Sequence, residues 1–124
     1  MTMASGMRGI VLFAHGSRDA AWRAPVEAVA RRLAERAPTV PVRCAYLELT
    51  APDLPTAAAE LVALGARELV VLPLFIGVGR HAREDLPRLV GALRDAHPGV
   101  RVDLRPAVGE DPRFVELMAD LVLA

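Results

Sequence analysis

The chain lacks lysine, has a single cysteine and carries no excess of either charge, and each of these features narrows its function. The fifteen lysine-plus-arginine positions are all arginine, and fifteen acidic residues balance them, so the formal net charge is zero. A protein that binds nucleic acid through its phosphates has a basic surplus, which is missing here. We attribute the absence of lysine to biased genome composition, which the many alanines also suggest.

The only cysteine, Cys44, excludes an internal disulfide framework and fits a reducing compartment. Because it lies in an apolar segment, it is expected to be a small core side chain and not a thiol ligand. Residues 1–7 hold neither a basic cluster nor a long apolar stretch, so they show no sign of a signal peptide. No segment approaches the roughly 18 apolar residues of a membrane span. We therefore expect a cytoplasmic protein.

The length and the apolar content predict one compact unit with a surface left over for a partner. A chain of 124 residues is expected to form a single domain, residues 1–124, with residues 1–7 disordered. Apolar residues make up 53% of the sequence, at or slightly above the usual range for globular proteins. Such an excess fits a protein that buries one more face against another molecule.

Four short apolar segments predict four β-strands. The first and third, residues 10–13 and 69–72, are continuously apolar, which is typical of strands buried on both faces in a parallel sheet. The second, residues 42–47, is interrupted by Arg43, and the fourth, residues 100–105, alternates apolar and charged side chains. We expect the two apolar strands in the middle of the sheet and the two mixed strands at its edges.

Apolar residues at helical spacing predict four helices between and after the strands. Their expected ranges are residues 22–36, 54–64, 85–97 and 111–122. Asp53 is placed to cap the second helix and Gly65 to end it. The last helix is expected to bury the side chains of Phe114, Leu117, Met118, Leu121 and Val122.

Strict alternation of strands and helices predicts an α/β fold. It would be a three-layer sandwich, with a four-stranded parallel sheet and helices on both faces. Central apolar strands and right-handed crossovers give the strand order 2-1-3-4, a flavodoxin-like arrangement cut short. In this order the topological switch lies between the first and third strands. Proteins of this class bind ligands there, outside the carboxyl ends of the strands.

A histidine follows each of the two central strands. His15 comes directly after the first strand, and His81 lies in the loop after the third. A single histidine at a strand end is more often a surface or capping residue than a ligand. The joint placement of these two at the predicted switch point indicates one shared site. His97, at a helix end beside a proline, has no such placement and is interpreted as a structural residue.

Two imidazoles and one nearby carboxylate would form a labile site for a divalent transition metal. Histidine is the commonest metal ligand and the side chain most readily used as a base near neutral pH. Glu48, at the end of the second strand, is the candidate carboxylate. Such a site falls short of the closed four-ligand set of structural zinc. It would hold its metal loosely, which suits delivery more than storage.

Three arginines surround the predicted site and allow two interpretations. Arg18 follows the first histidine, and Arg80 and Arg83 flank the second. They are either solvated loop charges or groups that bind a polycarboxylate or a phosphate, which guanidinium groups recognise through paired hydrogen bonds.

The loop after the third strand is rich in glycine and in apolar side chains. Gly77 and Gly79 either form a turn or allow a flat ligand to approach the backbone closely. The apolar segment at residues 74–78, which includes Phe75, is too long for a typical solvated loop. We expect it to cover a ligand, to line a dimer interface, or to do both.

Four motifs together resemble the CbiX/SirB family of sirohydrochlorin chelatases. They are Ala-His-Gly-Ser-Arg-Asp at 14–19, Tyr-Leu-Glu-Leu-Thr-Ala-Pro at 46–52, Pro-Leu-Phe-Ile-Gly-Val-Gly-Arg-His-Ala-Arg-Glu-Asp-Leu-Pro at 73–87, and Gly-Glu-Asp-Pro-Arg at 109–113. The likeness covers nearly the whole chain, and the paired histidine motifs in this order are specific to the family. The resemblance implies the chelatase-like form of the flavodoxin-like sandwich.

The resemblance also implies a reaction. It is that of an ATP-independent class II chelatase, a lyase that inserts a divalent metal into sirohydrochlorin in cobalamin or sirohaem biosynthesis, with release of the pyrrole protons. His15 and His81 match the metal-binding and catalytic histidines of the family, and Glu48 matches a recurrent acidic position. The three arginines would face the carboxylates of the tetrapyrrole, and the apolar segment at residues 75–78 would face its flat body.

The metal in this reaction is a substrate, and no organic cofactor is implied. Co²⁺ is the first choice by analogy with the family, with Fe²⁺ and Ni²⁺ as alternatives, because imidazole suits all three ions. The length matches the short, single-domain form, whose homodimer would supply the second lobe of the cavity. We expect neither nucleic acid nor a membrane as a partner.

Two further functions stay open at this point. The first is a metal- or tetrapyrrole-binding module that never performs insertion. The second is an enzyme of the histidine phosphatase type, since a His-Gly pair near a first strand is a feature of that superfamily. Those proteins carry arginine before the histidine, whereas Ala14 precedes His15 here, so we rank the phosphatase low.

Overall fold

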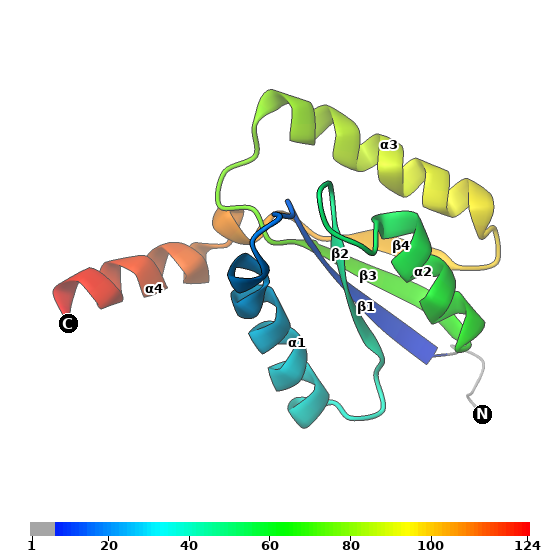
Figure 1. Ribbon diagram of the computed structural model, residues 1–124, viewed down its shortest axis with the longest axis horizontal. Helices are drawn as coiled ribbons and strands as arrows, with labels where there is room; N and C mark the ends of the chain where they lie inside the picture. The colour runs from blue at the N-terminus through cyan, green and yellow to red at the C-terminus, as the bar shows by residue number, and fades with distance from the viewer. Residues whose placement is uncertain (1–6) are drawn as a thin grey trace.

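The computed structural model describes residues 7–124, with the exception of the side chain of His81. It contains one sheet of four parallel strands in the order β2-β1-β3-β4 (Figure 1). The strands are β1 (Met7–Ala14), β2 (Val42–Tyr46), β3 (Ala66–Pro73) and β4 (Arg101–Leu104). The predicted fold class and strand order are confirmed. Met7 already belongs to β1, so the expected disorder does not reach it, and residues 1–6 lie outside the described part.

The two central strands are buried because their side chains are apolar on both faces. In β1, the side chains of Val11 and Phe13 enter the larger of two core clusters, and those of Leu12 and Ala14 enter the smaller one. This alternation follows from the two-residue repeat of a strand. In the register, Ala14 of β1 lies opposite Tyr46 of β2. The strands that carry the predicted site residues therefore end level with one another.

Helices cover the two faces of the sheet unequally. The smaller cluster lies under α1 (Ala24–Arg36), which a 3₁₀ turn at Ala20–Arg23 precedes. The larger cluster lies under α2 (Leu54–Ala63) and α3 (Arg80–Ala96) on the opposite face. Among residues 7–124, no helix combines the length and the apolar character that crossing a bilayer requires.

The start and the end of α2 follow the prediction from sequence. The Asp53 side chain caps the helix by accepting a hydrogen bond from the backbone N–H of Thr56 at 2.9 Å. Hydrogen bonds from Thr56 hold the pKa of Asp53 below its usual value. Gly65 follows the helix with φ +110°, a left-handed conformation that glycine adopts without a steric cost.

The third helix begins five residues earlier than the sequence predicted. It starts at Arg80 and not at Asp85, so Arg80, His81 and Arg83 belong to its first turn and not to a loop. The prediction was wrong because the apolar helical spacing begins only at Leu86, so the polar residues before it were assigned to the loop. The histidine motif therefore sits on a helix N-terminus.

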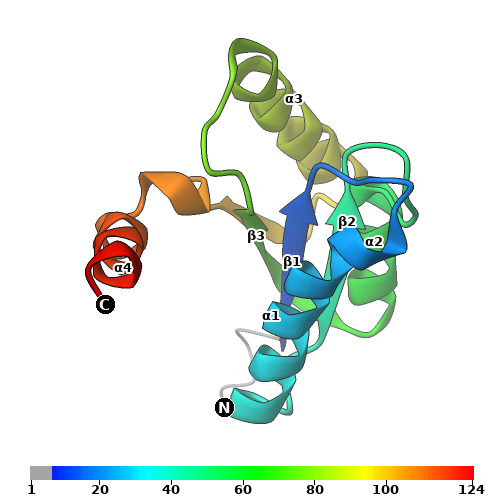
Figure 2. The same ribbon diagram turned by 60° about the vertical axis from the view of Figure 1, so that its left-hand side comes forward.

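The last helix is the largest departure from the prediction. A 3₁₀ turn at Val108–Glu110 leads into α4 (Pro112–Leu123), which points away from the rest of the molecule in both views (Figures 1 and 2). The predicted burial is wrong, because none of its residues is buried, including Phe114, Leu117, Met118, Leu121 and Val122. Helical spacing identified an apolar face correctly, but spacing carries no information about what covers that face.

Candidate functional site

His15 stands at the carboxyl end of β1 with its side chain exposed, directly beside the loop that follows β3. Its imidazole packs on the ring of Phe75, with 4.3 Å between the ring centroids and 35° between the planes. The backbone N–H of Leu74 donates to the carbonyl of Phe13 at 2.8 Å, which continues the pairing of β1 and β3 to the strand ends. The two loops therefore lie side by side, as the strand order predicted.

Phe75 supports His15 from inside the protein. Its side chain is only 2% exposed and also packs on Phe13, with ring centroids 6.1 Å apart. This burial leaves Phe75 almost no surface for a ligand. The predicted contact of Phe75 with a tetrapyrrole is therefore replaced by packing under the His15 ring. The neighbouring Ile76 is 74% exposed and is the apolar side chain of this segment that faces outward.

The loop that carries Glu48 presses directly against the His15 loop. The backbone N–H of Glu48 donates to the carbonyl of His15 at 3.0 Å, and the Glu48 side chain is exposed. Between them, Gly16 adopts φ +99°, and a Cβ at this position would lie 1.8 Å from the carbonyl oxygen of Glu48. Only glycine fits here. The need for glycine at position 16 was not predicted from sequence, although its position directly after the candidate histidine could have indicated it.

Thr50 fastens the same two loops with a pair of hydrogen bonds. Its hydroxyl accepts from the backbone N–H of Ser17 at 3.2 Å and donates to the Ser17 carbonyl. Arg18, the next residue, has an exposed side chain at the edge of the site. Ser17 and Thr50 received no role from the sequence, because a reciprocal bond between residues 33 positions apart leaves no local pattern.

His81 is the second residue of α3, whose N-cap is Gly79. Its side chain lies outside the described part of the structure, so the meeting of its imidazole with that of His15 stays a prediction. Among the side chains that the structure does describe, no three histidine, cysteine, aspartate or glutamate residues form a group that could hold a metal ion.

Two arginines at the start of α3, Arg80 and Arg83, are exposed and flank His81 in the sequence. Arg80 forms a loose ion pair with Glu84 at 3.5 Å, and both side chains are mostly solvated. The first turn of α3 contains no acidic residue, although the N-terminal end of a helix dipole favours negative charge. The helix dipole and the exposed Arg83 therefore favour an anionic ligand at this end of the site, while Glu84 offsets part of the Arg80 charge.

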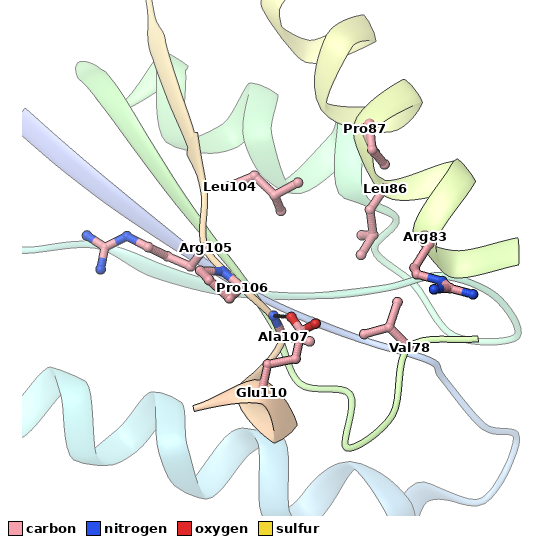
Figure 3. Close-up of a pocket in the computed structure, with 9 residues that line it drawn as sticks. All are labelled: Val78, Arg83, Leu86, Pro87, Leu104, Arg105, Pro106, Ala107 and Glu110. Carbon is pink, nitrogen blue, oxygen red and sulfur yellow. Dashed lines mark hydrogen bonds between the residues drawn. The ribbon is translucent and has the colours of Figure 1, made fainter. Parts of the chain in front are cut away.

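Arg83 borders a small cavity of about 180 Å³ between α3 and the segment that follows β4 (Figure 3). Its remaining walls include Val78, Leu86, Leu104, Ala107 and Glu110. The Glu110 carboxylate accepts a hydrogen bond from the Ala107 backbone at 3.2 Å, while Arg105 points away from the other side chains in Figure 3. This volume is below the roughly 300–1,000 Å³ of sites for small molecules, so the cavity is too small to hold the substrate by itself.

The glycines of the β3 loop differ from Gly16. A Cβ added to Gly77 or to Gly79 would have no atom within 4 Å, and neither residue has a left-handed backbone. Gly109 is the glycine that this loop requires, because a Cβ there would lie 1.7 Å from the carbonyl oxygen of Ile76. Its N–H also donates to the Phe75 carbonyl at 3.0 Å. From sequence, Gly109 was visible only as part of a motif.

Cys44 has no role in this site. It is half-buried and packs against the smaller core cluster on β2, in agreement with the expectation of a small core side chain. Burial raises the pKa of its thiol, and burial likewise raises the pKa of the Tyr46 phenol. Both groups therefore stay neutral near pH 7, and the thiol is a poor metal ligand.

Comparison with known proteins finds relatives along nearly the whole chain. The model of the CbiX family matches residues 9–123. The sirohydrochlorin cobaltochelatase of Methanocaldococcus jannaschii is 26% identical over 138 residues, which cover 92% of this chain and 96% of that protein. The sirohydrochlorin cobaltochelatase of Saccharolobus solfataricus is 36% identical over 89 residues, which cover 72% of this chain and 68% of that protein.

Solved structures show the same fold. A CbiX protein of Marinobacter aquaeolei, assigned to cobalamin (vitamin B12) biosynthesis, superposes with a TM-score of 0.80 at 34% identity and covers 94% of both chains. The sirohydrochlorin chelatase SirB of Bacillus subtilis, solved in complex with cobalt, also has a TM-score of 0.80. That match, at 22% identity, covers 94% of this chain and 50% of the longer SirB chain.

Proposed function

The chain belongs to the CbiX family, and we propose on this basis that it inserts a divalent metal ion into sirohydrochlorin without ATP. The metal is a substrate, with Co²⁺ as the first choice and Fe²⁺ and Ni²⁺ as alternatives, and no organic cofactor takes part. The observation that carries the proposal is the exposed imidazole of His15, held on Phe75 where β1 and β3 end together. This is the position at which α/β proteins bind ligands.

In this proposal His15 presents the metal to the macrocycle. One face of its ring packs on Phe75, so the orientation of the imidazole is set before the ion arrives. His81 on α3 supplies the second imidazole. A site with so few protein ligands leaves the remaining coordination positions of the ion to water and to the incoming pyrrole nitrogens.

The reaction also needs a base. Pyrrole nitrogens lose their protons as the metal enters, so a proton acceptor near the ion assists the exchange. An imidazole or the Glu48 carboxylate takes this role. Glu48 is suited to it because its backbone is hydrogen-bonded to that of His15 and its side chain is exposed.

The surroundings of the site suit the rest of the substrate. Arg18, Arg80 and Arg83 have exposed guanidinium groups that would bind the carboxylates at the edge of the macrocycle. The open backbone positions of Gly77 and Gly79 would allow the flat ring to approach.

The exposed apolar side chain of Ile76 would contact the body of the macrocycle, while Phe75 acts only from below. The proposed enzyme is a homodimer, in which a second copy closes the cavity. Its expected compartment is the reducing cytoplasm.

Separate His15→Ala and His81→Ala variants test the assignment. The fold should survive the first change because His15 is exposed. Insertion of Co²⁺, followed by the change in absorbance of sirohydrochlorin, should fall to the rate without enzyme in both variants. His97→Ala, which alters the histidine at the end of α3, is the matched control and should keep the original rate. Unchanged metallation rates in both site variants would refute the assignment.

The same assay distinguishes an enzyme from a binding module and compares the insertion rates of the three metal ions. A chelatase converts an excess of sirohydrochlorin to product, whereas a binding module shifts the spectrum only in proportion to the protein added. Measuring the insertion rate with Co²⁺, Fe²⁺ and Ni²⁺ in turn should give the highest value for Co²⁺. A higher rate with either alternative ion would reassign the metal without changing the reaction.

A further inference from the structure

Leu49 has a backbone conformation that leucine rarely adopts. Its φ of +66° lies in the left-handed region, and no other residue besides glycine has a positive φ within residues 7–124. The Cβ of an L-amino acid is crowded by the backbone in this region, so glycine, and less often asparagine or aspartate, occupies it at low cost. A leucine here is strained, and the surrounding structure has to hold it in place.

The residues on both sides of Leu49 are attached to the His15 loop. Before it, the N–H of Glu48 donates to the carbonyl of His15 at 3.0 Å. After it, the hydroxyl of Thr50 accepts from the N–H of Ser17 at 3.2 Å and donates to the carbonyl of the same residue. The hydrogen bonds that support the candidate site therefore also fix the strained backbone of Leu49.

Packing within the protein does not explain the choice of leucine at this position. The Leu49 side chain is 56% exposed and belongs to neither core cluster. Glycine or asparagine would form the same turn with less strain. A strained residue with an exposed apolar side chain beside a candidate site points to a contact outside the folded chain.

The other exposed apolar side chains gather at the same edge of the sheet. Outside α4, the described part of the chain exposes six large apolar side chains, and the segments after β1, β2 and β3 contain four of them: Trp22, Leu47, Leu49 and Ile76. Because β1 lies between β2 and β3 (Figure 2), the loops of Leu49 and Ile76 follow the strands on either side of the one that ends at His15. Apolar surface gathered in this way is typical of a binding site.

We propose that Leu49 determines specificity by packing its side chain on the apolar body of the tetrapyrrole, across the His15 loop from Ile76. The inference rests on the proposed function and adds a residue that selects the macrocycle. The backbone of Leu49 is already fixed in the free protein, so little conformational entropy is lost when the ligand binds. An apolar contact acts on bound substrate and transition state alike, so it should affect KM and leave kcat nearly unchanged.

The strained backbone could act in a second way, by directing the neighbouring Glu48 carboxylate. That function would move the proposed proton acceptor, so its loss should lower kcat at an unchanged KM. The two functions of Leu49 therefore differ in the kinetic constant that they control.

Leu49→Asn tests the apolar contact. Asparagine enters the left-handed region more readily than leucine, so the midpoint of denaturant unfolding should stay the same or rise. The affinity for metal-free sirohydrochlorin, measured by its change in absorbance, should fall roughly tenfold because an apolar contact is lost. KM should rise by a similar factor. Leu49→Met keeps an apolar side chain of similar volume and should retain most of the affinity.

The matched control is Leu64→Asn, the same change in a leucine that is 55% exposed at the end of α2. This residue precedes β3 and so lies at the amino edge of the sheet, away from the site. Its affinity and KM should equal those of the original chain. Unchanged affinity in Leu49→Asn, or a lower kcat at unchanged KM, would overturn the inference.

Two further measurements on Leu49→Asn could overturn the inference. A lower unfolding midpoint would show that the fold itself needs this leucine. A changed mass in solution, measured by light scattering, would show that the side chain contacts another copy of the protein and not the tetrapyrrole.

Binding without metal separates this inference from the proposed function. A chain that binds sirohydrochlorin through Leu49 but inserts no metal would refute the proposed function and keep the inference. Metal insertion with the same KM in the original chain and in Leu49→Asn would do the reverse. An original chain with no affinity for sirohydrochlorin would overturn both.

Discussion

The loop after β1 and the loop after β3 lie side by side at the carboxyl edge of the sheet, yet they are held differently. The first loop is fastened along its length by Gly16 against Glu48 and by Ser17 to Thr50. The second loop is anchored by the hydrogen bond from Gly109 to Phe75, and its own glycines, Gly77 and Gly79, have open space around them. One half of the site is thus a rigid support for a histidine, and the other half leaves the backbone accessible to a ligand.

Substitution of Phe75, where the two loops meet, should cause the largest loss of stability. Phe75→Ala removes a buried ring that supports His15 and fills the core beside Phe13. Such a change typically lowers the free energy of unfolding by about 3–5 kcal/mol. Phe75→Leu is the control, because it keeps most of the apolar volume and should cost much less. Denaturant unfolding measures both values, and equal stabilities of the two variants would show that the ring does not support the site.

The next largest effect is expected in the fastened loop. Gly16→Ala should lower stability through the left-handed backbone, about 1–2 kcal/mol. The clash with the Glu48 carbonyl adds about 1–3 kcal/mol, as overpacking does elsewhere. Displacement of His15 should also reduce metal insertion. Gly77→Ala is the matched control in the open loop and should be close to neutral for stability. Equal losses in the two variants would contradict the difference between the loops.

A smaller effect should follow from loosening the first loop without a clash. Thr50→Val keeps the shape of the side chain but removes both hydrogen bonds to Ser17. The expected loss of stability is about 1–3 kcal/mol, because each of the two hydrogen bonds has a net value of about 0.5–1.5 kcal/mol. Thr39→Val, at an exposed turn residue, serves as the control and should change little. A stability equal to that of the original chain would mean that these bonds do not hold the loop.

The smallest effect on stability is expected in the open loop. Gly77→Ala meets no atom within 4 Å and has no left-handed backbone to strain. The change should leave stability within about 0.5 kcal/mol or raise it slightly, because alanine restricts the unfolded chain. If a flat ligand approaches this backbone, KM for sirohydrochlorin should rise while kcat changes less. A large loss of stability would show that this loop is as tightly packed as the first.

Much of the arrangement that positions the site could be predicted from sequence. Continuous apolar character placed β1 and β3 in the centre of the sheet, since a strand buried on both faces needs apolar side chains on both. That placement set His15 next to the loop after β3. The supports of the site could not be predicted, because Gly16, Thr50 and Gly109 act through contacts with residues distant in the chain.

Local pattern also misled the prediction at two helices. The apolar spacing of α3 begins only at Leu86, so the polar first turn of the helix was assigned to the loop and its start was placed too late. The apolar spacing of α4 predicted burial, but none of its residues is buried in one copy of the chain. Phe75 was expected to face a ligand, whereas packing against Phe13 and His15 turned it into the core.

The amino-acid sequence by itself determined the elements, the strand order and the presence of a histidine near the switch point, because periodicity and chain connectivity are local properties. Only the tertiary structure decided how His15 is supported, where α3 begins, and that α4 leaves its own sheet uncovered. These outcomes depend on contacts between segments far apart in the chain, and the free energy of such contacts is fixed only when the whole molecule packs.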